Sequence, residues 1–186
     1  MLTRRPCAAG WVKNGGGHPM VRRIPVVTRH TTVHRERKVS AKVFVDANIL
    51  LYSEDGADPV KQSVALAWLR VLWHRRIGSL STQVLHEFYV NAVRKIKPPM
   101  PAGDARAEVR RYAQWQPWTI DQATLESAWA VETRYGLHYW DCLVVAAAQH
   151  AGCRYLLSED MGHEQYYDAV QVINPFKSSI ALLDAV

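Results

Sequence analysis

From Lys42 onward, short apolar segments alternate with longer segments of helical periodicity. The pattern predicts strands at residues 42–46, 77–80, 118–120, 154–158 and 170–173, and helices at residues 59–74, 82–96, 104–115, 122–135 and 139–151. Strands that alternate with helices are typical of a mostly parallel sheet that carries helices on both faces. The sequence therefore predicts an α/β fold.

The length and composition of the chain suit one such domain. Its 186 residues, of which 48% are hydrophobic, are enough for a well-buried core without disulfides or a structural metal. The three cysteines, Cys7, Cys142 and Cys153, form no C-x-x-C pair and suit a reducing compartment. No apolar run is long enough to cross a bilayer, and the amino terminus lacks the apolar core of a secretory signal. We therefore expect a cytoplasmic protein that does not associate with a membrane.

The positive charge is concentrated in the first 40 residues. Residues 1–40 carry nine Lys or Arg residues and one acid, which gives +8, whereas residues 41–186 carry fourteen bases and sixteen acids, which gives −2. Three consecutive glycines and the lack of a helical or strand period predict that residues 1–40 are a disordered basic extension. Residues 41–177 then form the folded domain, and residues 178–186 form a short C-terminal tail.

The basic extension has three explanations. It is an arm that binds nucleic acid through phosphate contacts, a non-functional extension from an upstream start codon, or an Arg-rich targeting peptide. The start-codon explanation requires the fewest assumptions, because composition alone supports a binding partner only weakly.

Four carboxylates fall at the ends or packed faces of the predicted elements. Asp46 closes the first strand and Asp160 follows the fourth by two residues, so both lie at carboxyl ends of strands, where open α/β sheets place their active sites. Helices that cover a parallel sheet run antiparallel to its strands, so their N-termini lie at the carboxyl edge of the sheet. Asp141 is near the start of its helix, and we therefore expect it at the same edge. Glu87 lies about five residues, or roughly 7.5 Å, along its helix, and its side chain could reach the same mouth. The spacing permits a cluster of these acids without requiring it.

Each acid also has a purely structural explanation. Asp46 could form an Asx turn at the end of its strand, and Glu87 could be a solvated helix residue near Arg94. Asp141 could be a helix cap, and Asp160 an ordinary loop acid. The functional interpretation gains weight because all four acids map to one side of one sheet.

Clustered carboxylates favour a divalent cation. Without metal, four close acids would repel one another and some would take up protons. Mg²⁺ prefers hard oxygen ligands and keeps several waters, so two or three carboxylates and a substrate phosphate suit it. No H-E-x-x-H motif or Cys/His cluster indicates zinc. A cation in this position would assist hydrolysis of a phosphodiester by activating water and neutralising developing charge.

Five segments carry a recognisable pattern: residues 43–50 (VFVDANIL), 82–88 (TQVLHEF), 140–148 (WDCLVVAAA), 156–161 (LLSEDM) and 173–176 (INPF). Together they resemble the PIN domain family, and within it they are most similar to VapC-like toxin ribonucleases. The resemblance covers about residues 42–176, and the ordered set is more specific than any one of its motifs.

The resemblance implies a single-stranded RNA endonuclease with a three-layer α/β/α fold, a mostly parallel central sheet, and Mg²⁺ or Mn²⁺ as cofactor. By this resemblance the catalytic, metal-binding acids are Asp46, Glu87, Asp141 and Asp160, with Asn48 and Ser158 as supporting polar residues. Our hypothesis is that Asp46 and Asp141 hold the principal ion. The other two acids then bind a second ion or position the attacking water, and the products carry 5′-phosphate and 3′-hydroxyl ends.

Glu164 departs from the family pattern. Similar sequences tend to carry glycine in this segment, so the glutamate adds a fifth acid and leaves the shape of the loop open. Residues 1–40 have no counterpart in the family.

The resemblance also implies partners. The substrate would be single-stranded or loop RNA, and the chain would be the toxin of a type II toxin–antitoxin pair, inhibited by an antitoxin whose arginine enters the acidic pocket. Apolar surface on the helices at residues 59–74 and 82–96 predicts a homodimer. Basic side chains such as those of Arg75, Arg76 and Arg94 could bind the phosphates of RNA, and aromatic side chains could stack on its nucleobases. Solvated helix surfaces and core packing explain most of these residues equally well.

Other functional classes fit the sequence less well. A phosphotransferase of the haloacid dehalogenase type needs D-x-D after the first strand, but Asn48 stands in the second position. A receiver domain needs an acidic pair and a later lysine, and neither is found. A non-catalytic RNA-binding or partner-binding protein with a PIN fold remains open, and ribonuclease activity separates it from the enzyme.

Overall fold

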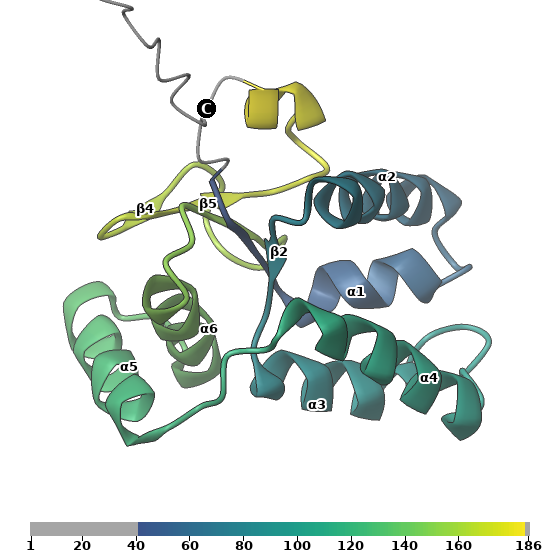
Figure 1. Cartoon of the computed structure of the whole chain (residues 1–186), viewed down its shortest axis with the longest axis horizontal. Helices are drawn as coiled ribbons and strands as arrows, with labels where there is room; N and C mark the ends of the chain where they lie inside the picture. The colour runs from purple at the N-terminus through teal and green to yellow at the C-terminus, as the bar shows by residue number, and fades with distance from the viewer. Residues whose placement is uncertain (1–40, 185–186) are drawn as a thin grey trace, which may run out of the picture. The chain divides into compact units, whose positions relative to one another are not determined.

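The computed structural model describes residues 41–184, so the predicted disordered extension lies outside the described residues. Its five strands are β1 (Val43–Val45), β2 (Gly78–Ser79), β3 (Tyr155–Leu157), β4 (Tyr166–Tyr167) and β5 (Val170–Ile173). The helices are α1 (Ala47–Glu54), α2 (Pro59–Arg75), α3 (Thr82–Ala92), α4 (Ala102–Tyr112), α5 (Gln122–Tyr135) and α6 (Tyr139–His150), with 3₁₀-helices η1 (Ala113–Trp115) and η2 (Ile180–Asp184). This sheet flanked by helices confirms the predicted α/β fold (Figure 1).

The sheet has the strand order β2-β1-β3-β5-β4. All neighbouring pairs are parallel except β4 with β5. The central strands β1 and β3 pair in register, with Val45 opposite Leu157, and the Asp46 N–H donates to the Leu157 carbonyl oxygen at 3.0 Å. The residues that follow these two strands, Asp46 and Ser158, therefore leave the sheet side by side.

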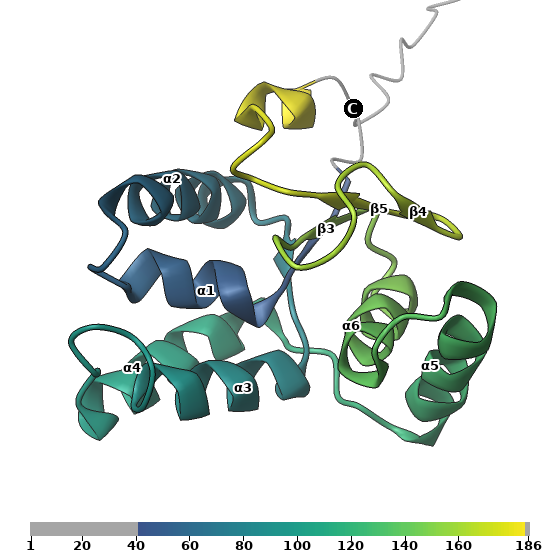
Figure 2. The ribbon, with the colours of Figure 1, turned by 180° about the vertical axis from the view of Figure 1, so that it is seen from behind.

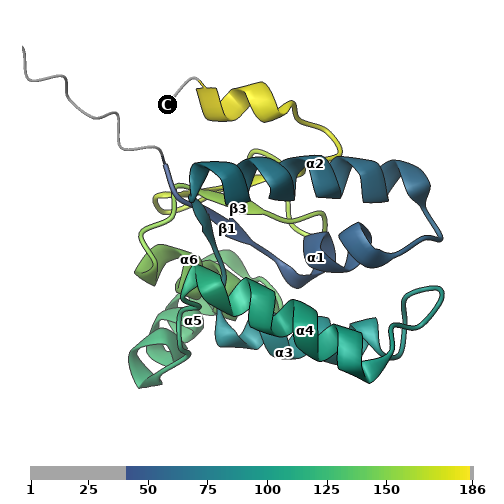
Figure 3. The same cartoon turned by 45° about the vertical axis from the view of Figure 1, so that its right-hand side comes forward.

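Helices cover both faces of the sheet. Figure 3 shows α2 on one side of β1 and β3 and helices α3 to α6 on the other, and Figure 2 shows α5 and α6 packed beside each other. Helix α1 continues from β1 and contacts both α2 and α3. Strand β1 is fully buried, as is usual for a central parallel strand covered on both faces.

Local signals account for the helix boundaries. Asp121 caps α5 by accepting a hydrogen bond from the Thr124 backbone N–H at 2.9 Å, and Gly136 ends the helix with a φ of 66°. Ser81 caps α3 in the same way through Val84. Helix α3 therefore begins at the predicted residue 82, and α5 has the predicted bounds of residues 122 and 135.

Some predicted elements were wrong or missed. Residues 118–120 do not form a strand; Trp118 makes one isolated bridge to Ser81, and the chain then turns into the cap of α5. Helix α3 ends at Ala92, four residues before the predicted end. Helix α1 and strand β4 were not predicted.

The last described residues pack on the domain. Leu183 of η2 is buried, and Arg75 donates to the Leu183 carbonyl oxygen at 3.2 Å and pairs with Asp184 at 2.5 Å. No helix within residues 41–184 is long and apolar enough to span a membrane.

Candidate active site

Asp46 lies where β1 ends and α1 begins. Its Oδ1 accepts a hydrogen bond from the Ala47 backbone N–H at 2.7 Å, so the carboxylate caps the helix. The residue is only 7% exposed. A negative charge at a helix N-terminus is favourable, which helps to hold this buried carboxylate in place.

A hydrogen-bonded cluster joins the ends of β1 and β3. Ser158 Oγ donates to Asp46 Oδ2 at 2.8 Å, and Asn48 Nδ2 lies 3.2 Å from the same oxygen. Asn48 Nδ2 also donates to Asp160 Oδ2 at 2.9 Å, and the Asp160 backbone N–H donates to Ser158 Oγ at 3.3 Å. Two segments more than 100 residues apart are thus linked by four polar side chains.

Glu87 and Asp141 belong to the same electrostatic environment, although no hydrogen bond among the described residues ties them to the cluster. Desolvation, followed by the charges of Asp141 and Asp160, raises the pKa of Glu87. Desolvation and the charge of Asp160 raise the pKa of Asp141, while His138 opposes the shift. The charge of Asp160 therefore acts on both of these acids.

Asp46 is the acid whose ionisation is most disfavoured. Burial, the largest cause, raises the pKa of Asp46 to about 7, and the charges of Glu87 and Asp160 add to the shift. Hydrogen bonds from Ser158 and the Ala47 backbone act in the opposite direction. All four predicted acids therefore interact, directly or through Asp160, at the carboxyl edge of the sheet.

The donor atoms of this edge suit a hard divalent cation. Asn48 Oδ1 is a buried amide oxygen with no hydrogen-bond partner within the described range, and the surrounding carboxylates carry excess negative charge. Among residues 41–184, no three His, Cys, Asp or Glu side chains are arranged to hold an ion together. Carboxylate and amide oxygens are the donors that a hard cation prefers, and Mg²⁺ commonly keeps water and phosphate in its other positions.

A lysine–glutamate pair beside the cluster escaped the sequence analysis. Lys61 of α2 donates to both Glu159 oxygens, at 2.6 and 2.7 Å, and to the Tyr52 hydroxyl at 3.3 Å. Its ammonium group lies 4.5 Å from the Tyr52 ring centroid and 5.3 Å from that of Phe176. Because Glu159 precedes Asp160, this contact anchors the segment that carries a predicted site residue. The adjacency of Glu159 to Asp160 was the only sequence signal, and it named no partner.

Glu164 adopts the backbone conformation for which glycine is suited. Its φ is 62°, in the left-handed region, and its backbone N–H donates to the Val172 carbonyl oxygen at 2.8 Å. The loop thus keeps a glycine-like turn despite the glutamate. The side chain is 72% exposed, and its Oε1 lies 3.9 Å from His163 Nε2.

Two further features border the acids. Trp140, the neighbour of Asp141, is 57% exposed and packs edge-on against Tyr139. A cavity of about 210 Å³ next to Asn48 is lined by residues of α1 and α3 and by Lys95. The sequence analysis considered aromatic and basic contacts only in general terms.

Comparisons with known proteins bear on the family and the fold of the chain. The PIN domain model matches residues 43–169 of the chain. No curated protein matches it significantly. Among solved structures, VapC20 of Mycobacterium tuberculosis, described as a toxin that cleaves the sarcin-ricin loop, is similar with a TM-score of 0.50 and 19% identity, over 62% of this chain and 87% of that chain. The structural likeness supports the fold, and the family match confirms the resemblance drawn from the motifs. The chain belongs to the PIN domain family.

Proposed function

We propose that the chain is a metal-dependent endoribonuclease that hydrolyses phosphodiester bonds in single-stranded or loop RNA. PIN domain proteins of the VapC type are nucleases, which supports hydrolysis of a nucleic acid as the general activity. The observation that carries the proposal for this chain is the hydrogen-bonded cluster around Asp46. The pKa of Asp46 is raised to about 7 because the carboxyl group is buried beside other acids. Acids placed so close together cost free energy unless a cation offsets their charge.

The residues that would hold Mg²⁺ or Mn²⁺ are Asp46, Glu87, Asp141 and Asp160. An additional oxygen would be Asn48 Oδ1, which has no hydrogen-bond partner among residues 41–184. A bound divalent cation would supply Lewis-acid stabilisation of the charge that develops on the phosphate during hydrolysis. We expect cleavage products with 5′-phosphate and 3′-hydroxyl ends.

The chain itself would prepare the site by fixing its innermost carboxylate. The Ala47 backbone N–H binds one oxygen of Asp46, and Ser158 and Asn48 bind the other, so the side chain has little rotational freedom. Because the donors are already in place, little reorganisation is needed when substrate binds. Ser158 and Asn48 are therefore proposed as positioning residues.

Residues around the acids offer contacts for RNA. The exposed face of Trp140 suits stacking of an unpaired base, and Lys95 suits a phosphate beside the cavity next to Asn48. An unpaired base can reach such a surface, whereas a base within a duplex cannot. These contacts support single-stranded or loop RNA as the substrate class.

The biological role that we propose is that of the toxin in a type II toxin–antitoxin pair. The structural neighbour VapC20 is described as a toxin, and its likeness in fold supports this role. A cognate antitoxin would insert an arginine among the acids, since a bidentate arginine–carboxylate pair is a strong contact. We also propose that the chain forms a homodimer, which light scattering at micromolar concentration would test.

Cleavage of a panel of structured RNAs tests the enzymatic proposal. The full-length protein is compared with Asp141→Asn, with Mn²⁺ added and with the metal chelated. We expect cleavage by the wild type only with metal, and a loss of at least about a hundredfold in rate on removal of the carboxylate. Asp104→Asn is the matched control, because Asp104 is an exposed aspartate in the first turn of α4. It should cleave at the wild-type rate.

The alternative is an RNA-binding or partner-binding protein that keeps the fold without catalysis. The lack of any three metal-binding side chains in close arrangement within residues 41–184 is the observation in its favour. A pure protein that binds the RNAs but leaves them intact with Mn²⁺ would establish this alternative. Equal cleavage by Asp141→Asn and the wild type would instead refute the assigned acids.

A further inference from the structure

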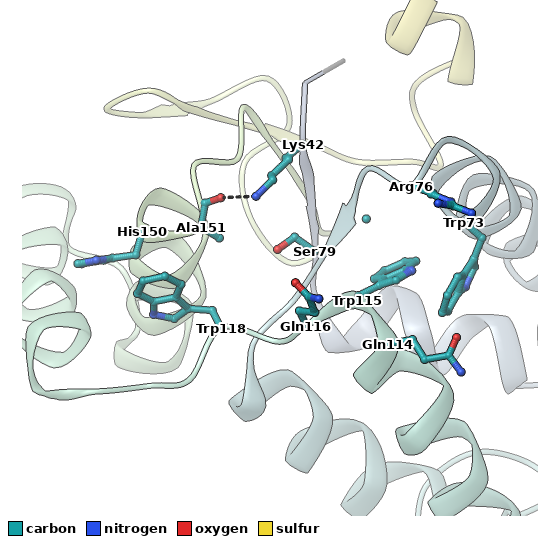
Figure 4. A pocket seen from close by; sticks show the side chains of 11 residues that line it. Lys42, Trp73, Arg76, Ser79, Gln114, Trp115, Gln116, Trp118, His150 and Ala151 are labelled. Atoms are coloured by element: carbon teal, nitrogen blue, oxygen red, sulfur yellow. Dashed lines mark hydrogen bonds between the residues drawn. The ribbon is translucent and has the colours of Figure 1, made fainter. Parts of the chain in front are cut away.

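A large cavity lies at the opposite edge of the sheet from the acids. Its volume is about 830 Å³, within the range of small-molecule and nucleotide pockets. It is built from residues that precede β1 or form β2, from the ends of α2 and α6, and from η1 and the segment that follows it (Figure 4). Lys42 precedes β1 and Arg76 precedes β2, so this part of the cavity lies at the amino edge, and the cavity continues along β2 to Trp118.

Tryptophan side chains form much of its wall. Trp115 lies so close to the backbone of β2 that a Cβ on Gly78 would be 2.6 Å from its ring, and its ring centroid is 4.7 Å from that of Trp73. Trp118 is fixed by a hydrogen bond from its Nε1 to Thr124 Oγ1 at 2.9 Å. These rings are held in place before any ligand arrives, which lowers the entropic cost of stacking.

The polar groups of the wall are rich in donors. Lys42 and Arg76 supply two positive charges, and none of the described residues that line the cavity is acidic. The indole N–H groups of Trp73 and Trp115 are buried without a hydrogen-bond partner among the described residues. Because both nitrogens are buried, a ligand in the cavity would meet the rings of these tryptophans and not their N–H groups.

We infer that this cavity is a second binding site for single-stranded RNA, in which an unpaired base stacks on a tryptophan of the wall and neighbouring phosphates bind Lys42 and Arg76. The inference rests on the proposed function only in taking RNA as the ligand. Bases offer flat faces and phosphates offer negative charge, so single-stranded RNA suits the rings and the cations together.

Other occupants satisfy fewer of these groups. The segment of residues 1–40 has a net charge of +8, so Lys42 and Arg76 would repel it. An apolar peptide side chain would leave Lys42 and Arg76 without an anionic partner. A ligand that is both anionic and aromatic is therefore favoured by charge and by stacking.

The two sites would hold one RNA strand at two points. Lys42 and Asp46 stand at opposite ends of β1, and the three residues of this strand separate their Cα atoms by about 13 Å. An RNA strand that passes around the edge of the sheet could contact both sites. The amino-edge cavity would then strengthen binding without contacting the scissile bond.

Binding without cleavage tests the inference. The full-length protein with Asp141→Asn is titrated in EDTA into a fluorescein-labelled single-stranded RNA oligonucleotide, and anisotropy gives Kd. We expect Trp118→Leu to raise Kd about tenfold through lost stacking. Arg76→Asn should raise Kd and reduce the slope of log Kd against log salt by about 1. Asparagine suits the left-handed backbone of position 76, where φ is 56°.

The matched controls replace the same types of residue, a tryptophan and an arginine, outside the cavity. Trp129→Leu alters a tryptophan that is 44% exposed on α5, and Arg106→Asn alters an exposed arginine on α4; neither residue lines the cavity. Both controls should bind RNA as the parent does, and melting temperatures establish that each variant is folded. If Trp118→Leu does not fold, the salt slope of Arg76→Asn decides.

Equal affinities for the cavity variants and their controls would overturn the inference, as would equal binding of a duplex of the same sequence. The outcome is independent of catalysis. If the wild type cleaves no RNA but the cavity variants lose binding, the proposed function fails and this second site stands.

Discussion

Opposing effects act on the ionisation of the Asp46 carboxyl group. The Ala47 backbone and the Ser158 hydroxyl stabilise its charged form, while burial and the charges of Glu87 and Asp160 raise its pKa to about 7. A neutral residue would cost less free energy at such a position, because unpaired buried charge is costly. The proposed metal site would offset this cost by placing a cation beside the carboxylate.

Glu164 shows strain that a substitution can relieve. We predict that Glu164→Gly stabilises the protein by about 1 kcal/mol, because a φ of 62° is costly for a residue with a Cβ and the side chain is largely exposed. Urea unfolding measures the change. Glu164→Ala removes the side chain but keeps the strain, so it should show no gain. A loss of stability in the glycine variant would contradict this account of the loop.

At the scale of elements, the Lys61–Glu159 pair connects α2 to the segment after β3. Both side chains are less than a third exposed. Partial burial raises the pKa of Glu159, but the hydrogen bonds from Lys61 and Tyr52 outweigh it, and the net shift is downward. A lowered pKa in the folded state means that the contribution to stability is present above the unfolded pKa of about 4.3 and is lost as pH falls through the folded value.

We therefore predict a pH-dependent effect of Lys61→Gln. The free energy of unfolding should fall by about 1 kcal/mol near neutral pH, and the difference from the wild type should shrink as pH falls below the pKa of Glu159. Chemical unfolding at several pH values measures it. A difference that does not vary with pH would show that Lys61 contributes through packing on Tyr52 and Phe176 and not through the ion pair.

Strand β2 depends on a glycine for its contact with η1. We predict that Gly78→Ala lowers the free energy of unfolding by about 1 to 3 kcal/mol, since the added Cβ would overlap the Trp115 ring at 2.6 Å. Gly103→Ala is the control: nothing lies within 4 Å, and alanine favours the helix α4. It should be neutral or slightly stabilising. Thermal melts of both variants give the comparison, and equal melting temperatures would refute the proposed contact.

Periodicity and capping residues located most of the elements, because the strands are continuously apolar and the helices have clear ends. Helix α1 was not predicted because apolar residues occupy much of its circumference, so that no polar face marks a helical period. Strand β4 has only two residues, too few to show alternation. The predicted strand at residues 118–120 has the right residue types, but its backbone pairs at one position only. Pairing of this kind depends on tertiary contacts that a local pattern does not contain.

The sequence could place the four acids at one edge through topology, but it could not give their contacts. Whether Asn48 bridges Asp46 and Asp160 depends on side-chain rotamers and on the register of β1 with β3. The Lys61–Glu159 pair joins residues 98 positions apart, and no local signal links them. Aromatic residues had a simpler explanation as core, so the amino-edge cavity was not foreseen.

At the scale of the molecule, the two edges of one sheet differ in chemistry. The carboxyl edge gathers acids, and the amino edge gathers tryptophans and cations. The folded domain has no excess of positive charge, since residues 41–186 carry a net charge of −2. Binding of an anionic polymer must therefore rely on local placement of charge, or on a cation held by the acids.

The melting temperature of the full-length protein during titration with Mn²⁺ tests the central claim most directly. At a concentration about 100 times Kd, binding should stabilise the wild type by about 2.7 kcal/mol, a rise of roughly 5 °C or more. Asp46→Asn keeps the shape and the helix cap but removes the buried charge, so its metal-free form should melt at or above the wild-type temperature and show no response to Mn²⁺. An equal rise in both proteins would contradict a metal site at these acids.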